Sequence, residues 1–172
     1  MSWGTKRIAG RTYGLRHMNP FVIGVTPAAA GAPTFSVAVR FGCHTFTREW
    51  TGRETPDFRF THGSEVRCFC PIRYGLSRHL PDIVRRTAAL GEKAYFDARH
   101  NYLLIERLPE IEGPYAVFFT MERSKHSTAD VAMFVTSAYE KRRLPRNIPK
   151  ITFATLVGKH SRGERVRRPL RS

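Results

Sequence analysis

The clearest structural signal in the chain is the stretch Thr34-Phe35-Ser36-Val37-Ala38-Val39-Arg40-Phe41, in which apolar and polar positions alternate. Successive side chains of a β-strand point to opposite faces, so Phe35, Val37, Val39 and Phe41 share one face. This alternation predicts a half-buried strand over residues 34–41. Two continuations are open: the strand runs past Gly42 and places His44 on the face of Arg40 and Arg48, or Gly42 marks a β-bulge that shifts that face.

The remaining elements follow on either side of this strand. Residues 58–60 and 66–70 flank the turn-like sequence Thr61-His62-Gly63-Ser64, which predicts a short hairpin. Residues 77–90 have helical periodicity, with Ser77 as a candidate cap, Pro81 in the first turn and Gly91 as the stop. Further strands are expected over these ranges: 93–96, 102–107, 114–121, 130–137 and 151–157.

Short connections between consecutive strands favour an antiparallel meander, because parallel pairs need long crossovers. The expected fold class is α+β, a mostly antiparallel twisted sheet with one main helix packed on a face. The chain has 172 residues, a length typical of one domain. We expect an irregular basic arm over residues 1–19, a single globular domain over 20–158 and a basic tail over 159–172.

The net charge of +15 is concentrated at the two ends of the chain. Residues 1–48 carry +6, residues 49–140 carry −1 and residues 141–172 carry +10. A charge of this size favours a polyanionic partner, and nucleic acid is the first candidate. An anionic membrane surface, an acidic protein partner and a purely solubilising tail are the alternatives.

Several other classes of function find little support. No apolar run approaches the roughly 20 residues that span a bilayer, and three cysteines make no disulfide framework, so we expect a cytoplasmic protein. Cys68 and Cys70 flank a single residue near His62, whereas structural zinc sites usually show two ligand pairs with wider spacing. No glycine-rich phosphate loop occurs. We therefore expect no cofactor and no metal.

Neutral and basic groups remain as candidates for chemistry. Metal-free RNA cleavage needs a base for the 2′-hydroxyl, an acid for the leaving oxygen and cations for the developing charge. His79 at the helix start, His44 after the first strand, and Ser137 and Tyr139 at the end of a late strand are the candidate catalytic residues. The candidate nucleic-acid-binding residues are Arg40, Arg48, Arg73, Arg78, Lys141, Arg142, Arg143, Arg146, Lys159 and Arg162.

The order of one helix, strand hairpins and then Phe134-Val135-Thr136-Ser137-Ala138-Tyr139 resembles the small endoribonuclease toxins of the barnase, colicin D and RelE type. The resemblance covers residues 77–141 and implies that His79 or Arg78 takes the helix role, with Ser137 and Tyr139 in the late-strand role. It also implies a cognate antitoxin as a partner. Residues 34–70 and the basic tail have no counterpart there. The whole chain resembles bacterial mobile-element proteins described as stationary-phase growth adaptation proteins.

Two hypotheses follow from these observations. The first is a toxin-like, metal-independent endoribonuclease, for which RNA is the expected substrate because the reaction uses the 2′-hydroxyl. The second is a non-catalytic RNA- or DNA-binding accessory protein of a plasmid or phage. Basic groups and aromatic side chains serve either function, since aromatics stack on bases and cations meet phosphates. Convergence of His79, Ser137 and Tyr139 in one basic cleft would favour the enzyme.

Overall fold

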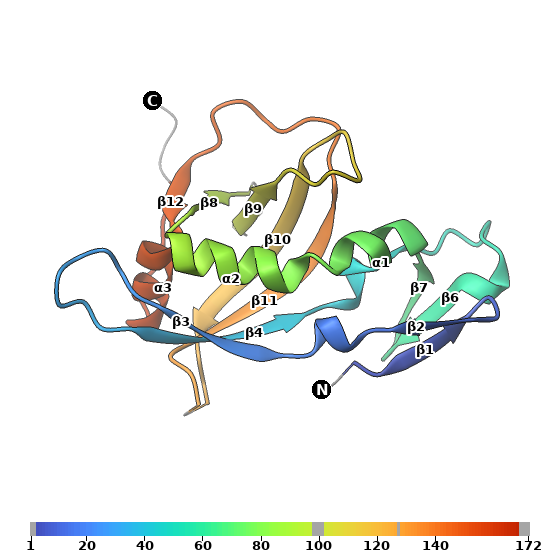
Figure 1. The fold of residues 1–172 in the computed structure, drawn as a ribbon, viewed down its shortest axis with the longest axis horizontal. Coiled ribbons are helices and arrows are strands. Elements are labelled where there is room, and N and C mark those ends of the chain that lie inside the picture. The colour runs from blue at the N-terminus through green and yellow to red at the C-terminus, as the bar shows by residue number, and fades with distance from the viewer. Residues whose placement is uncertain (1–2, 98–101, 127, 169–172) are drawn as a thin grey trace.

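A computed structural model describes residues 3–97, 102–126 and 128–168. Its main feature is a seven-stranded sheet in the order β12-β8-β9-β10-β11-β4-β3 (Figure 1). These strands are β3 (Phe21–Val25), β4 (Phe35–Phe41), β8 (Lys93–Phe96), β9 (Tyr102–Glu106), β10 (Tyr115–Arg123), β11 (Val131–Glu140) and β12 (Lys150–Thr152). All neighbouring pairs are antiparallel except β11 and β4, which are parallel. The α+β prediction is confirmed, and β8 to β11 form the expected meander.

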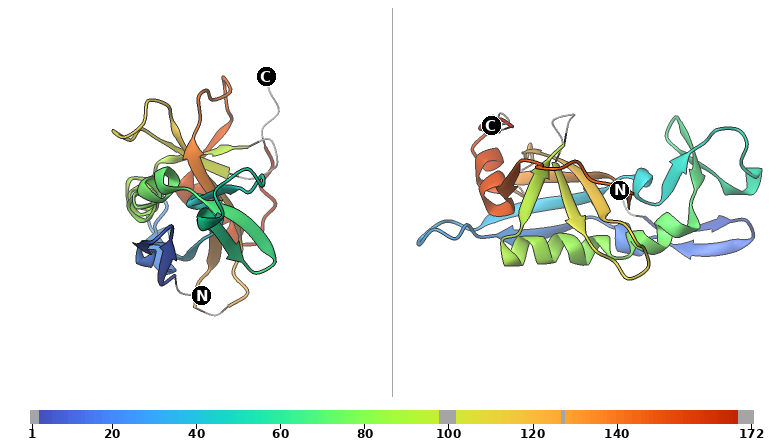
Figure 2. Two further views of the ribbon diagram at one scale, coloured as in Figure 1. Left: turned by 90° about the vertical axis from the view of Figure 1, so that its right-hand side faces the viewer. Right: turned by 90° about the horizontal axis from the view of Figure 1, so that it is seen from above.

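Two smaller β units lie at one end of the elongated molecule (Figure 2). One is a three-stranded antiparallel sheet of β5 (Thr47–Glu49), β7 (Glu65–Phe69) and β6 (Arg59–His62). The other is the hairpin of β1 (Thr5–Ile8) and β2 (Arg11–Gly14). Short 3-10 helices η1 (Arg16–Met18), η2 (Cys43–Thr45) and η3 (Pro56–Phe58) connect the strands. The predicted hairpin between residues 58 and 70 is confirmed as β6 and β7.

One face of the large sheet carries the core. Helices α2 (Leu80–Leu90) and α3 (Phe153–Ser161) bury apolar side chains against the inward residues of β10 and β11. Val37, Val39 and Phe41 of β4 are buried, as the alternating pattern predicts, while Phe35 is only partly buried. The opposite face holds a small cluster around Leu103, Ala116 and Phe118. We call this second face the open face.

The helix prediction for residues 77–90 is correct at its end and wrong at its start. Gly91 closes α2 in the left-handed conformation, with a φ of 60°, and Pro81 lies in the first turn. A separate helix α1 (Pro71–Ser77) precedes α2, and its first residue is a proline, which suits that position. Ser77 is therefore no cap; it is buried at the end of α1, where its hydroxyl donates to the Tyr74 carbonyl.

The prediction of a strand over residues 151–157 is wrong beyond Thr152. The side chain of Thr152 accepts a hydrogen bond from the Thr155 amide at 3.2 Å, which caps α3. Phe153, Leu156 and Val157 then lie on one buried helical face. The apolar run was too short for its period to distinguish a buried strand from a buried helix.

The irregular conformation expected for the N-terminal segment is also wrong. Residues 5–14 pair as a regular hairpin, and Ile8, Leu15 and Met18 are buried in the main core. The turn of this hairpin contains Gly10 at a φ of 75°, which glycine adopts without steric cost. Helix α3 runs through residue 161, so the expected tail begins as helix. Residues 1–2 of the arm and 169–172 of the tail lie outside the described residues.

Candidate nucleic-acid interface

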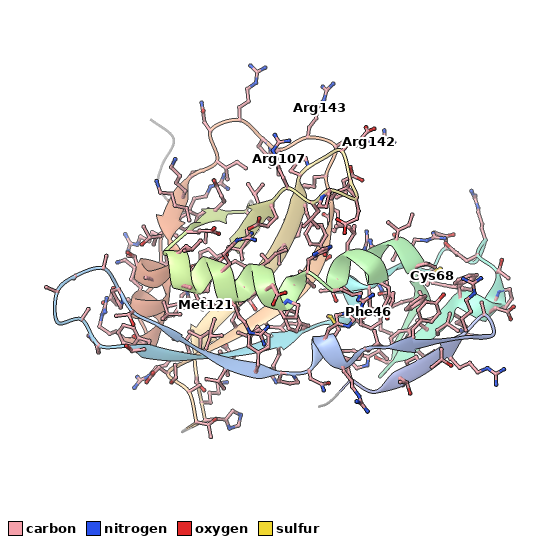
Figure 3. All side chains as sticks on the ribbon, viewed as in Figure 1. Phe46, Cys68, Arg107, Met121, Arg142 and Arg143 are labelled. Atoms are coloured by element: carbon pink, nitrogen blue, oxygen red, sulfur yellow. The ribbon has the colours of Figure 1, made fainter. Side chains whose placement is uncertain are left out.

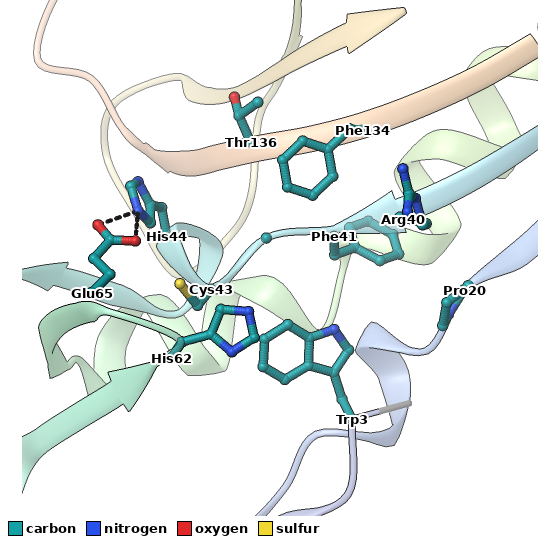
Figure 4. Close-up of a pocket in the computed structure, with 11 residues that line it drawn as sticks. Trp3, Pro20, Arg40, Phe41, Cys43, His44, His62, Glu65, Phe134 and Thr136 are labelled. Carbon is teal, nitrogen blue, oxygen red and sulfur yellow. Dashed lines mark hydrogen bonds and ion pairs between the residues drawn. The ribbon is translucent and has the colours of Figure 1, made fainter. Parts of the chain in front are cut away.

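A cavity of about 560 Å³ lies between the large sheet and the three-stranded sheet (Figure 4). Its walls come from β4, β6, β7, β11 and η2 together with residues near the N-terminus. The lining residues are Trp3, Pro20, Arg40, Phe41, Gly42, Cys43, His44, His62, Glu65, Phe134 and Thr136. The rings of Trp3 and His62 stack with centroids 5.1 Å apart. The cavity thus combines aromatic walls with titratable side chains.

Strand β11 connects this cavity to the far end of the sheet. Phe134 pairs with Thr120 on β10, and Tyr139 pairs with Ala116, so both side chains lie on the open face. The register shifts between them, because Phe118 pairs with Ser137 whereas Phe119 pairs with Val135. This β-bulge brings Ser137 and Tyr139 to the side of Phe134. We call Phe134, Thr136, Ser137 and Tyr139 the β11 stripe.

The side chains of the β11 stripe differ in their freedom to meet a ligand. Phe134 is 39% exposed, and its parallel neighbour on β4 is the exposed Arg40. Thr136 donates its hydroxyl hydrogen to the Phe118 carbonyl at 3.2 Å. Among the described residues, the Ser137 hydroxyl has no hydrogen-bond partner. Ser137 therefore keeps a donor and an acceptor available on a half-buried strand position.

Tyr139 is fixed between an aromatic ring and a cation. Its ring stacks on Phe118 at a centroid distance of 5.3 Å, and the Arg73 guanidinium lies 4.9 Å from its centroid. Arg73 also donates to the Thr47 carbonyl at 2.7 Å and to the His44 carbonyl at 3.4 Å. Burial lowers the pKa of Arg73 from its ordinary value, although a guanidinium remains protonated at neutral pH. Arg73 thus connects Tyr139 to η2 and β5.

Cations gather where β9 and β11 end and along the loop that follows β11, and all but the half-buried Lys141 are exposed. Glu106 pairs with Tyr115, which pairs with Glu140, so the residues after Glu106 and Glu140 lie at the same end of the sheet. Figure 3 shows the resulting group around Arg107. We call Arg107, Lys141, Arg142, Arg143 and Arg146 the basic edge.

Little within the protein neutralises the basic edge. None of its five cations makes an ion pair with another described residue. Glu140 is beside it, but its carboxylate accepts from the Gly113 amide at 2.7 Å. Lys141 instead lies over the Phe118 ring, at 5.4 Å from the centroid. This contact joins the basic edge to the aromatic pair formed by Phe118 and Tyr139.

The structure separates the four candidate catalytic residues. Ser137 and Tyr139 lie together on the open face, whereas His79 directly precedes α2 in the helix layer and contacts Glu110 through Nε2 at 2.8 Å. His44 contacts Glu65 at 2.7 Å in the cavity. Strand β4 ends at Phe41, and the chain then forms the 3-10 helix η2. The sequence predicted either a longer strand past Gly42 or a β-bulge at Gly42, and neither is correct. Among the described residues, no contact joins His79 to Ser137 or Tyr139, so the convergence that would favour the enzyme is not seen.

The candidate binding residues divide in the same way. Those on or beside the β11 stripe and the basic edge are Arg40, Arg73, Lys141, Arg142, Arg143 and Arg146. Arg48 is paired with Glu54 at 2.7 Å. Lys159 and Arg162 both contact Glu164 at the end of α3. Arg78 lines a separate hollow beside His79.

Sequence reasoning missed the cavity and two of its features. Cys43 and His44 approach Glu65, which is more than 20 residues away in the sequence and separated from them by β5, η3 and β6. The stacking of Trp3 on His62 depends on the N-terminal segment, which was expected to be irregular. Burial, together with the nearby Glu65, raises the pKa of the Cys43 thiol. The only sequence signal for this meeting of side chains was that a cysteine and a histidine are adjacent at residues 43–44.

Comparison with known proteins identifies a family that covers most of the chain. The YjaZ family model matches residues 5–161, which include both β units, the large sheet and α3. No curated protein and no solved structure matches the chain. Among the described residues, no helix combines the length and the apolar composition needed to cross a bilayer.

Proposed function

We propose that this chain, which belongs to the YjaZ family, binds single-stranded RNA along the β11 stripe, with phosphates held at the basic edge. The observation that carries the proposal is the run from Phe134 through Tyr139 to the exposed cations after residue 140. Proteins that bind single strands combine a cationic track for the backbone with aromatic side chains on which bases stack. Here the aromatic component lies along β11 on the open face, and the cationic component lies at the end of that strand.

The aromatic component favours single strands over duplexes. Bases in a duplex are stacked on one another and do not present their faces to a protein. Phe134 is exposed on the strand, and Tyr139 lies beyond it on the same side. Phe118 and Arg73 already lie against the Tyr139 ring, so the exposed ring of Phe134 is the one on which a base stacks, and Tyr139 lines the path beside it.

The preference for RNA over DNA is assigned to Ser137. Its hydroxyl lies between the two aromatic positions and has no hydrogen-bond partner among the described residues. A 2′-hydroxyl both donates and accepts hydrogen bonds, and it is the group by which a protein distinguishes RNA from DNA. A hydrogen bond between the two hydroxyls would stabilise the RNA complex alone.

The test compares the binding of a fluorescent oligouridine and the matching deoxyoligonucleotide by anisotropy. We expect the wild type to bind RNA more tightly, and Ser137→Ala to lower RNA affinity toward the DNA value without changing DNA affinity. Phe134→Leu should weaken both, since one stacked base contributes about 1–3 kcal/mol. Thr12→Ala, in the exposed hairpin, is the matched control. Equal affinities of wild type and Phe134→Leu would refute the proposal.

The same samples separate binding from cleavage. Because His79 is bound to Glu110 apart from the β11 stripe, the proposal requires no acid–base role for it. We expect His79→Ala to bind RNA as the wild type does. RNA cleavage in excess EDTA that is lost in His79→Ala would instead favour the toxin-like endoribonuclease.

A further inference from the structure

Three potential metal ligands meet at the wall of the cavity. Cys43 and His44 belong to η2, and Glu65 is the first residue of β7 (Figure 4). One donor atom from each lies within 4.8 Å of the other two. His44 Nε2 is 2.7 Å from Glu65 Oε1 and 2.9 Å from Oε2. We propose that Cys43, His44 and Glu65 bind a zinc ion whose fourth coordination position opens into the cavity.

The donor set selects the class of metal. A thiolate, an imidazole and a carboxylate together are ligands for zinc, whereas calcium and magnesium take oxygen donors. Zinc bonds of about 2.0–2.3 Å place tetrahedral donors roughly 3.3–3.7 Å apart. The imidazole and carboxylate are closer than this, and the thiol lies within 4.8 Å of them. Small side-chain rotations therefore suffice to form the site.

Neighbouring groups hold the three ligands in position. Buried Thr47 donates its hydroxyl to the Cys43 carbonyl at 2.7 Å and accepts from Arg67 Nε at 3.1 Å. Arg67 Nη1 in turn contacts Glu65 Oε1 at 3.2 Å. Such second contacts orient metal ligands, and their loss commonly lowers metal affinity by about 10–100-fold. Thr47 thus connects η2 and β7 without using a ligand atom.

The fourth position distinguishes this site from a purely structural one. Structural zinc sites are closed by four protein ligands, while three ligands leave a position for water or another small ligand. Only three donors converge here among the described residues, and all three side chains line the 560 Å³ cavity. A zinc-bound water would therefore face the space between Trp3, His62 and Phe134.

The test titrates the full-length, chelator-treated protein with Co²⁺ as a spectroscopic probe, followed by displacement with Zn²⁺. We expect one equivalent to bind with tetrahedral visible bands and a thiolate charge-transfer band. Cys43→Ser should remove the charge-transfer band, and His44→Ala should weaken binding. Thr47→Val should lower the affinity about 10–100-fold while leaving the spectrum unchanged.

Two controls keep the result specific. His79 and Glu110 form a similar pair at 2.8 Å, and the metal group found among the described residues does not include them, so His79→Ala should bind Co²⁺ as the wild type does. Cys68→Ser removes a buried thiol outside the cluster and should keep the charge-transfer band. His44 is 39% exposed, so its replacement leaves the core intact. A charge-transfer band that survives in Cys43→Ser, or no tetrahedral spectrum at one equivalent, would overturn the proposal.

Discussion

Removing three cations from the basic edge should change the salt dependence of RNA binding by a calculable amount. If each of its five cations neutralises one phosphate, the slope of log affinity against log salt is about −3.5 on a single strand. Binding then weakens roughly 100-fold between 50 and 200 mM salt, by the same relation. Replacing Arg142, Arg143 and Arg146 by alanine leaves two contacts, so the slope falls to about −1.4 and the loss to roughly sevenfold.

The matched control removes the same charge elsewhere. Lys6, Arg7 and Arg11 are exposed on the N-terminal hairpin, which lies away from the basic edge (Figure 1). Replacing these three by alanine lowers the net charge by three, from +15 to +12, as the first triple variant does. Fluorescence anisotropy with a labelled single-stranded RNA, repeated at several salt concentrations, gives both slopes. Equal flattening in the two variants would mean that total charge, rather than the basic edge, determines binding, and would refute the reasoning.

Three further predictions concern stability. Burial lowers the pKa of His160 from its ordinary value of 6.5, so the unfolded chain binds a proton more readily than the folded protein does. The melting temperature should therefore fall as the pH drops below about 6.5, and the fall should be smaller in His160→Gln. Thr152→Ala removes the cap of α3 and should cost about 1 kcal/mol in urea unfolding, whereas a change below 0.3 kcal/mol would contradict the capping role. Tyr115→Phe should raise the unfolding free energy by about 1 kcal/mol, because the buried Tyr115 hydroxyl has no hydrogen-bond partner among the described residues. A loss of stability in calorimetry would contradict this and indicate that the hydroxyl does form a hydrogen bond.

The parts of the fold that local pattern determines could be predicted from the sequence. Strict alternation defined β4, and the close spacing of apolar runs defined the β8–β11 meander. The run over residues 151–157 was ambiguous because seven apolar-rich residues suit a strand or a helix equally. The N-terminal hairpin was missed because its short strands carry mostly exposed side chains, and their pairing depends on one glycine turn.

The candidate site was only partly predictable for a related reason. Tyr139, Arg73 and the cations after residue 140 stand out by residue type, and the structure brings them to one end of the sheet. The bulge that turns Ser137 and Tyr139 outward depends on pairing between β10 and β11. The meeting of Cys43 with Glu65 depends on how the smaller sheet packs against the larger one. Neither arrangement leaves a periodic signal in one segment of chain.

Photo-crosslinking of bound single-stranded RNA, with the crosslinked peptides identified by mass spectrometry, tests the central claim most directly. The RNA carries 4-thiouridine, and crosslinking is done at low salt with the full-length protein. The proposal predicts crosslinks within residues 131–146, at Phe134 above all, and their loss on competition with unlabelled RNA. Crosslinks confined to the hairpin over residues 5–14 or to residues 159–168 would contradict it.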